Sequence, residues 1–210
     1  MKYLNGQRNI LLQYTESILR YIEKIHYSPA ITHEHNVGDY THYFAKLLNI
    51  NDEEAKKLKF AARLHDVGKV GIAPSILDKS KPLTLSQRQK IEKHSIMGYQ
   101  ILSRIPHPLT QFSAIVALYH HENFDGSGCP EGLKGEKIPF EARLCSICDV
   151  YDALRKKRSY KKNFSHQETV ELMLTHGERG LAHKFDPAML KEFEKHHTVF
   201  EKMSLEFSDA

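Results

Sequence analysis

Residues 61–69 read Ala-Ala-Arg-Leu-His-Asp-Val-Gly-Lys, which places the pair His65-Asp66 where a predicted helix runs into a glycine. Gly68 can leave helical geometry without a clash at Cβ, so we expect the helix to end there. Ending the helix would let His65 and Asp66 turn toward one point, whereas in a regular helix they would diverge by about 100°. The pair His120-His121 repeats the arrangement, since it follows an apolar helical stretch and precedes a turn-rich one. Each of these two helix ends is therefore expected to present a pair of ligand-type side chains.

The rest of the chain also has the pattern of helices. Residues 9–26 carry leucine and isoleucine at spacings of three and four, which is typical of an amphipathic helix. Glycine and proline gather in residues 68–82 and 123–139, which predicts loops there. No segment alternates with period two, so the predicted fold class is all-α. Four further helix starts are predicted from capping residues: Asn51 with Glu54, Thr84 with Gln87, Ser165 with Glu168, and Asp186 with Pro187.

Composition and charge are those of an ordinary globular protein. The 210 residues are 40% hydrophobic and 27% charged, which suits one packed domain with an extra element. No apolar run reaches the roughly 20 residues of a membrane span, and the start lacks a secretory signal, so we expect a cytoplasmic protein without a membrane partner. The net charge of +4 is small, which disfavours binding to long nucleic acids. The three cysteines cannot all pair, which argues against a disulfide framework.

Fourteen histidines are unusual for a chain of this length, and most are expected to be ordinary core or surface residues. One set differs, because it combines imidazoles and carboxylates on or at the ends of predicted helices. Its members are His65, Asp66, His94, His120, His121 and Asp149. Mixed nitrogen and oxygen ligands suit iron, manganese, zinc or cobalt, whereas calcium and magnesium prefer oxygen alone. The set therefore predicts a transition-metal site.

The chain resembles the HD-GYP family of cyclic di-GMP phosphodiesterases, within the wider HD-domain metal phosphohydrolases. The resemblance covers roughly residues 35–200 and implies an HD-domain bundle of about seven helices in residues 29–205. An amphipathic helix in residues 1–28 would precede the bundle. The matching motifs, in order, are His65-Asp66-Val67-Gly68-Lys69, Pro74-Ser75-Ile76-Leu77, His94 with Gly98, His120-His121-Glu122, Asp125-Gly126-Ser127-Gly128-Cys129-Pro130, Gly132-Leu133-Lys134-Gly135-Glu136, Asp149-Val150-Tyr151-Asp152-Ala153-Leu154, Arg158-Ser159-Tyr160 and Phe185-Asp186-Pro187.

What the resemblance implies for the site is a centre of two divalent transition metals, with iron or manganese expected. One ion would be held by His35, His65, Asp66 and Asp149. Asp66 would bridge to a second ion held by His94, His120 and His121. Such a centre attracts a phosphodiester anion and activates water for attack on phosphorus.

Four residues are expected to contact the substrate. Lys69 would stabilise charge or donate a proton at the leaving group, so Asp66 and Lys69 are the predicted catalytic residues. Arg158 and Lys161 match the family positions that hold the phosphates of the ligand. The loop residue Cys129 is expected to contact the substrate at the edge of the site.

The sequence departs from the family pattern at three places, one of which is Asn123, where an arginine commonly follows the His-His-Glu triplet. It reads Gly128-Cys129-Pro130 where the family has Gly-Tyr-Pro, so a phenol that should position the substrate is missing. Some relatives carry a glutamate four residues before the first ligand and bind a third metal with it, but that position is Ile31 here. We therefore expect two metals, and we take Glu34, next to His35, as a solvated surface residue.

The predicted function is metal-dependent hydrolysis of cyclic di-GMP to the linear dinucleotide, with further cleavage to GMP left open. One alternative is a catalytically weak module that binds a cyclic dinucleotide or a partner protein, and the loss of the tyrosine supports it. Another alternative is an HD phosphohydrolase with a different nucleotide substrate. A homodimer and an upstream regulatory domain remain open as partners, since residues 9–26 could form a dimer contact.

Overall fold

The computed structural model describes residues 30–77, 82–156 and 164–208. The predicted amphipathic helix in residues 1–28 lies outside these ranges, as do the two predicted phosphate contacts Arg158 and Lys161. The described residues form helices and connecting loops and contain no strand, so the predicted all-α class is confirmed. In this part of the chain, no helix is both long enough and apolar enough to cross a membrane.

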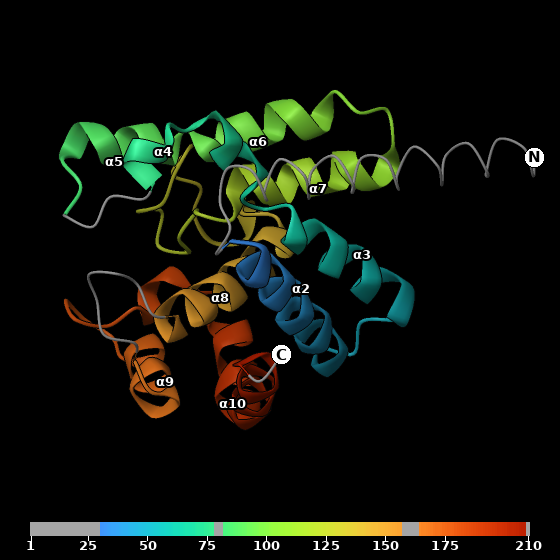
Figure 1. The fold of residues 1–210 in the computed structure, drawn as a ribbon. Coiled ribbons are helices and arrows are strands. Elements are labelled where there is room, and N and C mark those ends of the chain that lie inside the picture. The colour runs from blue at the N-terminus through green and yellow to red at the C-terminus, as the bar shows by residue number, and fades with distance from the viewer. Residues whose placement is uncertain (1–29, 78–81, 157–163, 209–210) are drawn as a thin grey trace, which may run out of the picture.

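The described chain runs through a series of helices joined mostly by short connections (Figure 1). The α-helices are α2 (Ala30–Leu47), α3 (Asp52–Arg63), α4 (Pro74–Leu77), α5 (Leu85–Glu92), α6 (His94–Ser103), α7 (Pro108–Tyr119), α8 (Phe140–Arg155), α9 (His166–Leu174) and α10 (Pro187–Ser208). Three short 3-10 helices are η1 (Val67–Gly71), η2 (Gly135–Lys137) and η3 (Ala182–Lys184).

Helix α2 lies at the centre of the bundle and packs against α3, α8 and α10. Figure 1 shows α6 and α7 side by side above α2, α3 and α8, with α9 and α10 below them. Aromatic rings join the lower helices: Tyr40 of α2 stacks on Phe200 of α10 at 5.3 Å between centroids, and Tyr151 of α8 meets both rings edge-on. All three side chains are fully buried, and each such ring removes roughly 150–250 Å² from water. This packing fixes α2 and α8 relative to each other.

The predicted capping residues begin the helices as expected. The Asn51 side chain accepts a hydrogen bond from the Glu54 amide, and Thr84 and Ser165 form reciprocal capping boxes at α5 and α9. Asp186 caps α10, because its Oδ1 accepts from the Ala188 amide at 2.8 Å, while its Oδ2 pairs with Arg143 of α8. These local signals were readable because each uses one side chain and its near neighbours in the sequence.

The segment after His65-Asp66 differs from the predicted loop. Helix α3 ends at Arg63, before the pair, and the chain then forms η1 and α4 where residues 68–82 were expected to lack helices. Gly68 does not have a positive φ, so its role is not to leave helical geometry. A Cβ at Gly68 would lie 1.9 Å from the His94 carbonyl oxygen, so glycine is required for η1 to touch α6. This close approach brings Asp66 beside His94.

We predict that Gly68→Ala destabilises the protein, because the added methyl meets rigid backbone and must push η1 away from α6. Overpacking of this kind costs about 1–3 kcal/mol in the free energy of unfolding. Gly71→Ala is the matched control, since a Cβ there meets the flexible Met97 side chain rather than backbone. Urea denaturation of the three proteins checks this, and an equal loss in both variants would contradict the account of Gly68.

Candidate metal centre

Histidine and aspartate side chains gather in two neighbouring groups where the helices converge. The first group is Asp66, His94, His120 and His121, and the second is His33, His65 and Asp149. Within each group, one possible ligand atom per residue lies within 4.8 Å of all the others. The residues come from α2, from the turn before η1, from the start of α6, from the end of α7 and from α8. Six of the seven predicted metal ligands are therefore brought together, and the exception is His35.

The first group surrounds one oxygen of Asp66. His94 Nε2 lies 3.1 Å from Asp66 Oδ1, and His120 Nε2 lies 3.8 Å from the same oxygen. The two Nε2 atoms are 3.3 Å apart. The ring of His121 packs on that of His120 with centroids 4.0 Å apart, which brings it into the same space. Three imidazoles and one carboxylate oxygen thus converge on a volume of the size that a transition metal occupies.

The second group surrounds Asp149. Its Oδ1 lies 3.0 Å from His33 Nε2 and 3.7 Å from His65 Nε2. His65 Nε2 is also 3.4 Å from Asp66 Oδ2, so Asp66 faces both groups with different oxygens. A carboxylate in this position is suited to bridge two cations.

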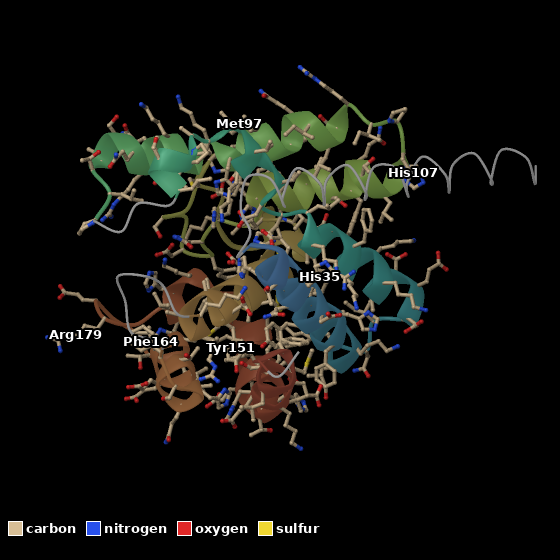
Figure 2. All side chains as sticks on the ribbon, viewed as in Figure 1. His35, Met97, His107, Tyr151, Phe164 and Arg179 are labelled. Atoms are coloured by element: carbon tan, nitrogen blue, oxygen red, sulfur yellow. The ribbon has the colours of Figure 1, made fainter. Side chains whose placement is uncertain are left out.

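The place predicted for His35 is taken by His33. Two positions along an α-helix rotate a side chain by about 200°, so His33 and His35 point away from each other on α2. His33 faces α8, and His35, labelled in Figure 2, belongs to neither group. With His33 as the first ligand, the position where some relatives carry a metal-binding glutamate, four residues earlier, is Pro29 instead of Ile31. Proline has no side-chain atom that binds a metal.

The sequence contains a spacing that pairs His33 with α8. His33 and Asn36 are three residues apart, and so are Asp149 and Asp152, which puts each pair on one face of a helix. In the structure these faces meet: Asp152 accepts from His33 Nδ1 at 2.6 Å and from the Asn36 amide at 2.9 Å. Asp152 therefore orients the ring of His33, and carboxylates commonly hold metal-ligating histidines in this way.

Backbone carbonyls orient three of the other histidines. The Nδ1 atom of His65 lies 2.6 Å from the Ala62 oxygen, and that of His94 lies 2.5 Å from the Ile91 oxygen. His120 Nδ1 lies 3.0 Å from the Ala117 oxygen. Each carbonyl requires a proton on Nδ1, so Nε2 is the nitrogen that faces the interior of the site. The chain therefore orients these imidazoles so that Nε2 can bind a metal once it carries no proton.

Buried polar atoms without partners lie between the two groups. Neither His65 Nε2 nor Asp66 Oδ1 has a hydrogen-bond partner among the described residues, although both are buried. Such groups cost roughly 1–3 kcal/mol each when left unsatisfied, so their presence calls for an explanation. Cations bound between the groups would satisfy both atoms, and the residues present therefore fit a metal centre.

Protons and Lys69 supply positive charge beside the carboxylates of the site. Burial lowers the pKa of His33, but its hydrogen bonds to Asp149 and Asp152 outweigh this and raise the pKa to about 10. Burial likewise opposes ionisation of Asp66, yet the charges of Lys69 and His65 hold its pKa well below the usual value. Lys69 donates a hydrogen bond to Asp66 Oδ2. Metal binding must displace these partners, so it is coupled to proton release.

The histidine pair at the end of α7 is held neutral. Burial, followed by the charge of His94, lowers the pKa of His121 to about 4. Burial and the neighbouring imidazoles also place the pKa of His120 well below its ordinary value. Both rings therefore keep free lone pairs at neutral pH, which is the state that metal ligation requires.

Glu34 is not the surface residue that the sequence suggested. It is 4% exposed, and its Oε2 has no hydrogen-bond partner in the described part of the chain. Burial, followed by the charge of Asp66, raises the pKa of this carboxyl. Glu34 thus adds a buried carboxyl group beside the second group. It was expected at the surface because it does not stand where some relatives carry a metal-binding glutamate.

The loop after His120-His121 is fastened to the site. Glu122 is buried and accepts hydrogen bonds from the amides of Glu131 and Leu133 at 2.7 and 3.0 Å. The Cys129 amide donates to the His121 carbonyl at 3.1 Å. These bonds hold the backbone of Cys129 beside His121, while its role as a substrate contact stays a prediction.

Comparison with known proteins relates the chain to one family. A family model described as "HD domain" matches residues 17–189. Over 79% of its length the chain is 36% identical to the cyclic di-GMP phosphodiesterase response regulator RpfG of Xanthomonas campestris, and the match covers 43% of that protein. Over 80% of its length it is 36% identical to 3'3'-cGAMP-specific phosphodiesterase 2 of Vibrio cholerae, with 31% of that protein covered. The chain thus spans less than half the length of these relatives.

Solved structures support the same fold. An HDG"Y"P protein from Bdellovibrio bacteriovorus superimposes with a TM-score of 0.59 at 22% identity, covering 91% of this chain and 63% of the other. At that identity the likeness concerns the fold, while the family model and the sequence relatives carry the assignment. The chain belongs to the HD domain family, as its resemblance to the HD-GYP proteins led us to expect.

Proposed function

We propose that this chain is a metal-dependent phosphodiesterase that opens cyclic di-GMP to the linear dinucleotide. The observation that carries the proposal is the pair of ligand groups that share Asp66 and leave buried nitrogen and oxygen atoms unsatisfied. Further cleavage to GMP, a location in the cytoplasm, and a homodimer or an upstream regulatory domain belong to the proposal as well.

The proposed centre holds two ions. His33, His65, Asp66 and Asp149 would hold one, with His33 replacing the predicted His35, while Asp66, His94, His120 and His121 would hold the other. Iron or manganese suits this mixture of imidazoles and carboxylates. When bound, such ions lower the pKa of water to near neutrality and stabilise charge on phosphate oxygens.

Lys69 would act on the substrate. Burial lowers its pKa, but the charge of Asp66 outweighs that effect and raises it above the ordinary value, so Nζ keeps its proton at neutral pH. An ammonium group in this position can bind a phosphate oxygen or donate a proton to the leaving oxygen. The remaining predicted contacts are Cys129 in the loop and the phosphate-binding pair Arg158 and Lys161.

The nature of the cyclic dinucleotide is the open choice within this proposal. The two relatives described above act on cyclic di-GMP and on 3'3'-cGAMP, so the second nucleotide is the specific rival. Cys129 stands where the family tyrosine would position the substrate, which also keeps a weak, binding-only module as an alternative. Hydrolysis rates separate these possibilities.

The test is a panel of nucleotides incubated with protein loaded with manganese or ferrous iron. We expect hydrolysis of cyclic di-GMP to exceed that of 3'3'-cGAMP and of a mononucleotide. Asp66→Asn should reduce the rate by at least about a hundredfold, because loss of even an outer partner of a metal ligand costs ten- to a hundredfold. Asp39→Asn, which changes a carboxylate paired with Lys59 and Arg63 away from the site, is the control. Chromatography of the products measures the rates. If no nucleotide is cleaved at any metal concentration, the proposal is contradicted.

A second prediction separates His33 from His35 on α2. His33→Ala should weaken manganese binding about ten- to a hundredfold, since it removes a ligand and leaves Asp152 without that ring. His35→Ala should leave the affinity unchanged, because His35 belongs to neither group. Equilibrium dialysis with elemental analysis measures both, and a larger loss in the His35 variant would restore the original assignment.

A further inference from the structure

A second cluster of histidine and carboxylate side chains lies away from the proposed catalytic centre, between α9 and α10. It consists of His166 on α9 and of His197 and Glu201 on α10. The three side chains line an open hollow of about 660 Å³, whose other lining residues are Ser165, Gln167, Val170 and Glu171. No residue of this cluster belongs to the two groups around Asp66.

The distances within the cluster are short. His166 Nε2 lies 2.8 Å from His197 Nδ1 and 4.0 Å from Glu201 Oε2. On the other side of the His166 ring, Nδ1 lies 2.8 Å from the hydroxyl of Tyr151. Tyr151 lies two residues after Asp149 on α8, so it points away from the catalytic centre toward α9 and α10 (Figure 2).

We propose that His166, His197 and Glu201 form a binding site for a zinc ion. In a tetrahedral site with bonds of about 2.0–2.1 Å, neighbouring ligand atoms are roughly 3.3 Å apart. The two distances from His166 Nε2, 2.8 and 4.0 Å, lie on either side of this value. The ligand atoms of the three residues do not all lie within 4.8 Å of one another, as those of the two groups around Asp66 do. Binding therefore requires the Glu201 side chain, which is 45% exposed and has room to move, to turn toward His197.

The chemistry of the cluster also favours zinc. Two imidazole nitrogens and one carboxylate oxygen suit zinc better than magnesium or calcium. His166 is 7% exposed, and burial lowers the pKa of its ring, which keeps the nitrogen unprotonated for binding. Metal-ligating histidines usually donate a hydrogen bond from their second nitrogen. Here Nδ1 of His166 can donate to the hydroxyl oxygen of Tyr151, because a phenol oxygen can accept as well as donate. The open hollow leaves a fourth position for water.

The competing explanation is a simple chain of hydrogen bonds. Tyr151 would donate to His166, and His166 would donate through Nε2 to His197. In that arrangement the proton between the two rings occupies the place of the ion, and Glu201 contributes nothing. The two explanations differ in whether the protein takes up an additional zinc ion.

The test compares zinc bound per chain in full-length wild type, His197→Ala and Glu201→Gln, after equilibrium dialysis against micromolar zinc. Wild type should bind one more ion per chain than His197→Ala, whatever the catalytic centre holds. Glu201→Gln should show at least a tenfold weaker affinity for that ion. Hydrolysis of cyclic di-GMP by the manganese-loaded enzyme should be the same in all three proteins, since these residues do not touch the catalytic centre.

His196→Ala is the matched control. His196 is the next residue on α10 and also has a glutamate partner one turn away, Glu192 at 3.9 Å, but it does not line the hollow with His166. Its zinc content should equal that of wild type. Equal zinc content in wild type and His197→Ala would overturn the proposal in favour of the hydrogen-bond chain. If His197→Ala fails to fold by circular dichroism, Glu201→Gln decides, and unchanged zinc affinity in it would overturn the proposal.

Discussion

The Asp66 carboxylate lies between two groups of side chains rich in histidine, and the packing of the helices brings both groups to it. Its Oδ1 faces His94 and His120, while its Oδ2 faces His65 and Lys69. The residue is 5% exposed, so its charge must be compensated within the protein. The approach of η1 to α6 at Gly68 places it against the first group, and the packing of α2 on α8 brings the second group to it.

The electrostatics of the metal-free protein follow from that constraint. His33, whose pKa is raised to about 10, and Lys69 provide positive charge beside Asp149 and Asp66. On the other side of Asp66, burial keeps His120 and His121 neutral. One half of the site is thus compensated by protons and the other half offers lone pairs. Metal ions can replace the protons and bind the lone pairs. Burying these charged and polar groups costs free energy, and metal binding would offset that cost.

Much of this could be predicted from the sequence. The fold class and the helix starts at Asn51, Thr84, Ser165 and Asp186 depend on local patterns, and the structure confirms them. Six of the seven residues expected around the metals also converge, because helix ends bring neighbouring side chains together. His35, which was expected from the family resemblance, lies outside both groups, and His33 lies in the place proposed for it. Choosing between the two histidines requires knowing which face of α2 meets α8. That face is set by the contact of His33 and Asn36 with Asp152, more than a hundred residues away.

The same dependence on distant contacts explains the other differences. Glu34 looked exposed because it was placed relative to His35, and the short helices after Asp66 form because η1 packs on α6.

The central claim is that Asp66 joins two metal sites, one of which includes His33. Anomalous diffraction from crystals of the manganese-loaded protein tests it most directly. The account predicts two peaks on either side of Asp66, one within about 2.3 Å of His33 Nε2. A single peak, or an ion bound to His35 in place of His33, would contradict it.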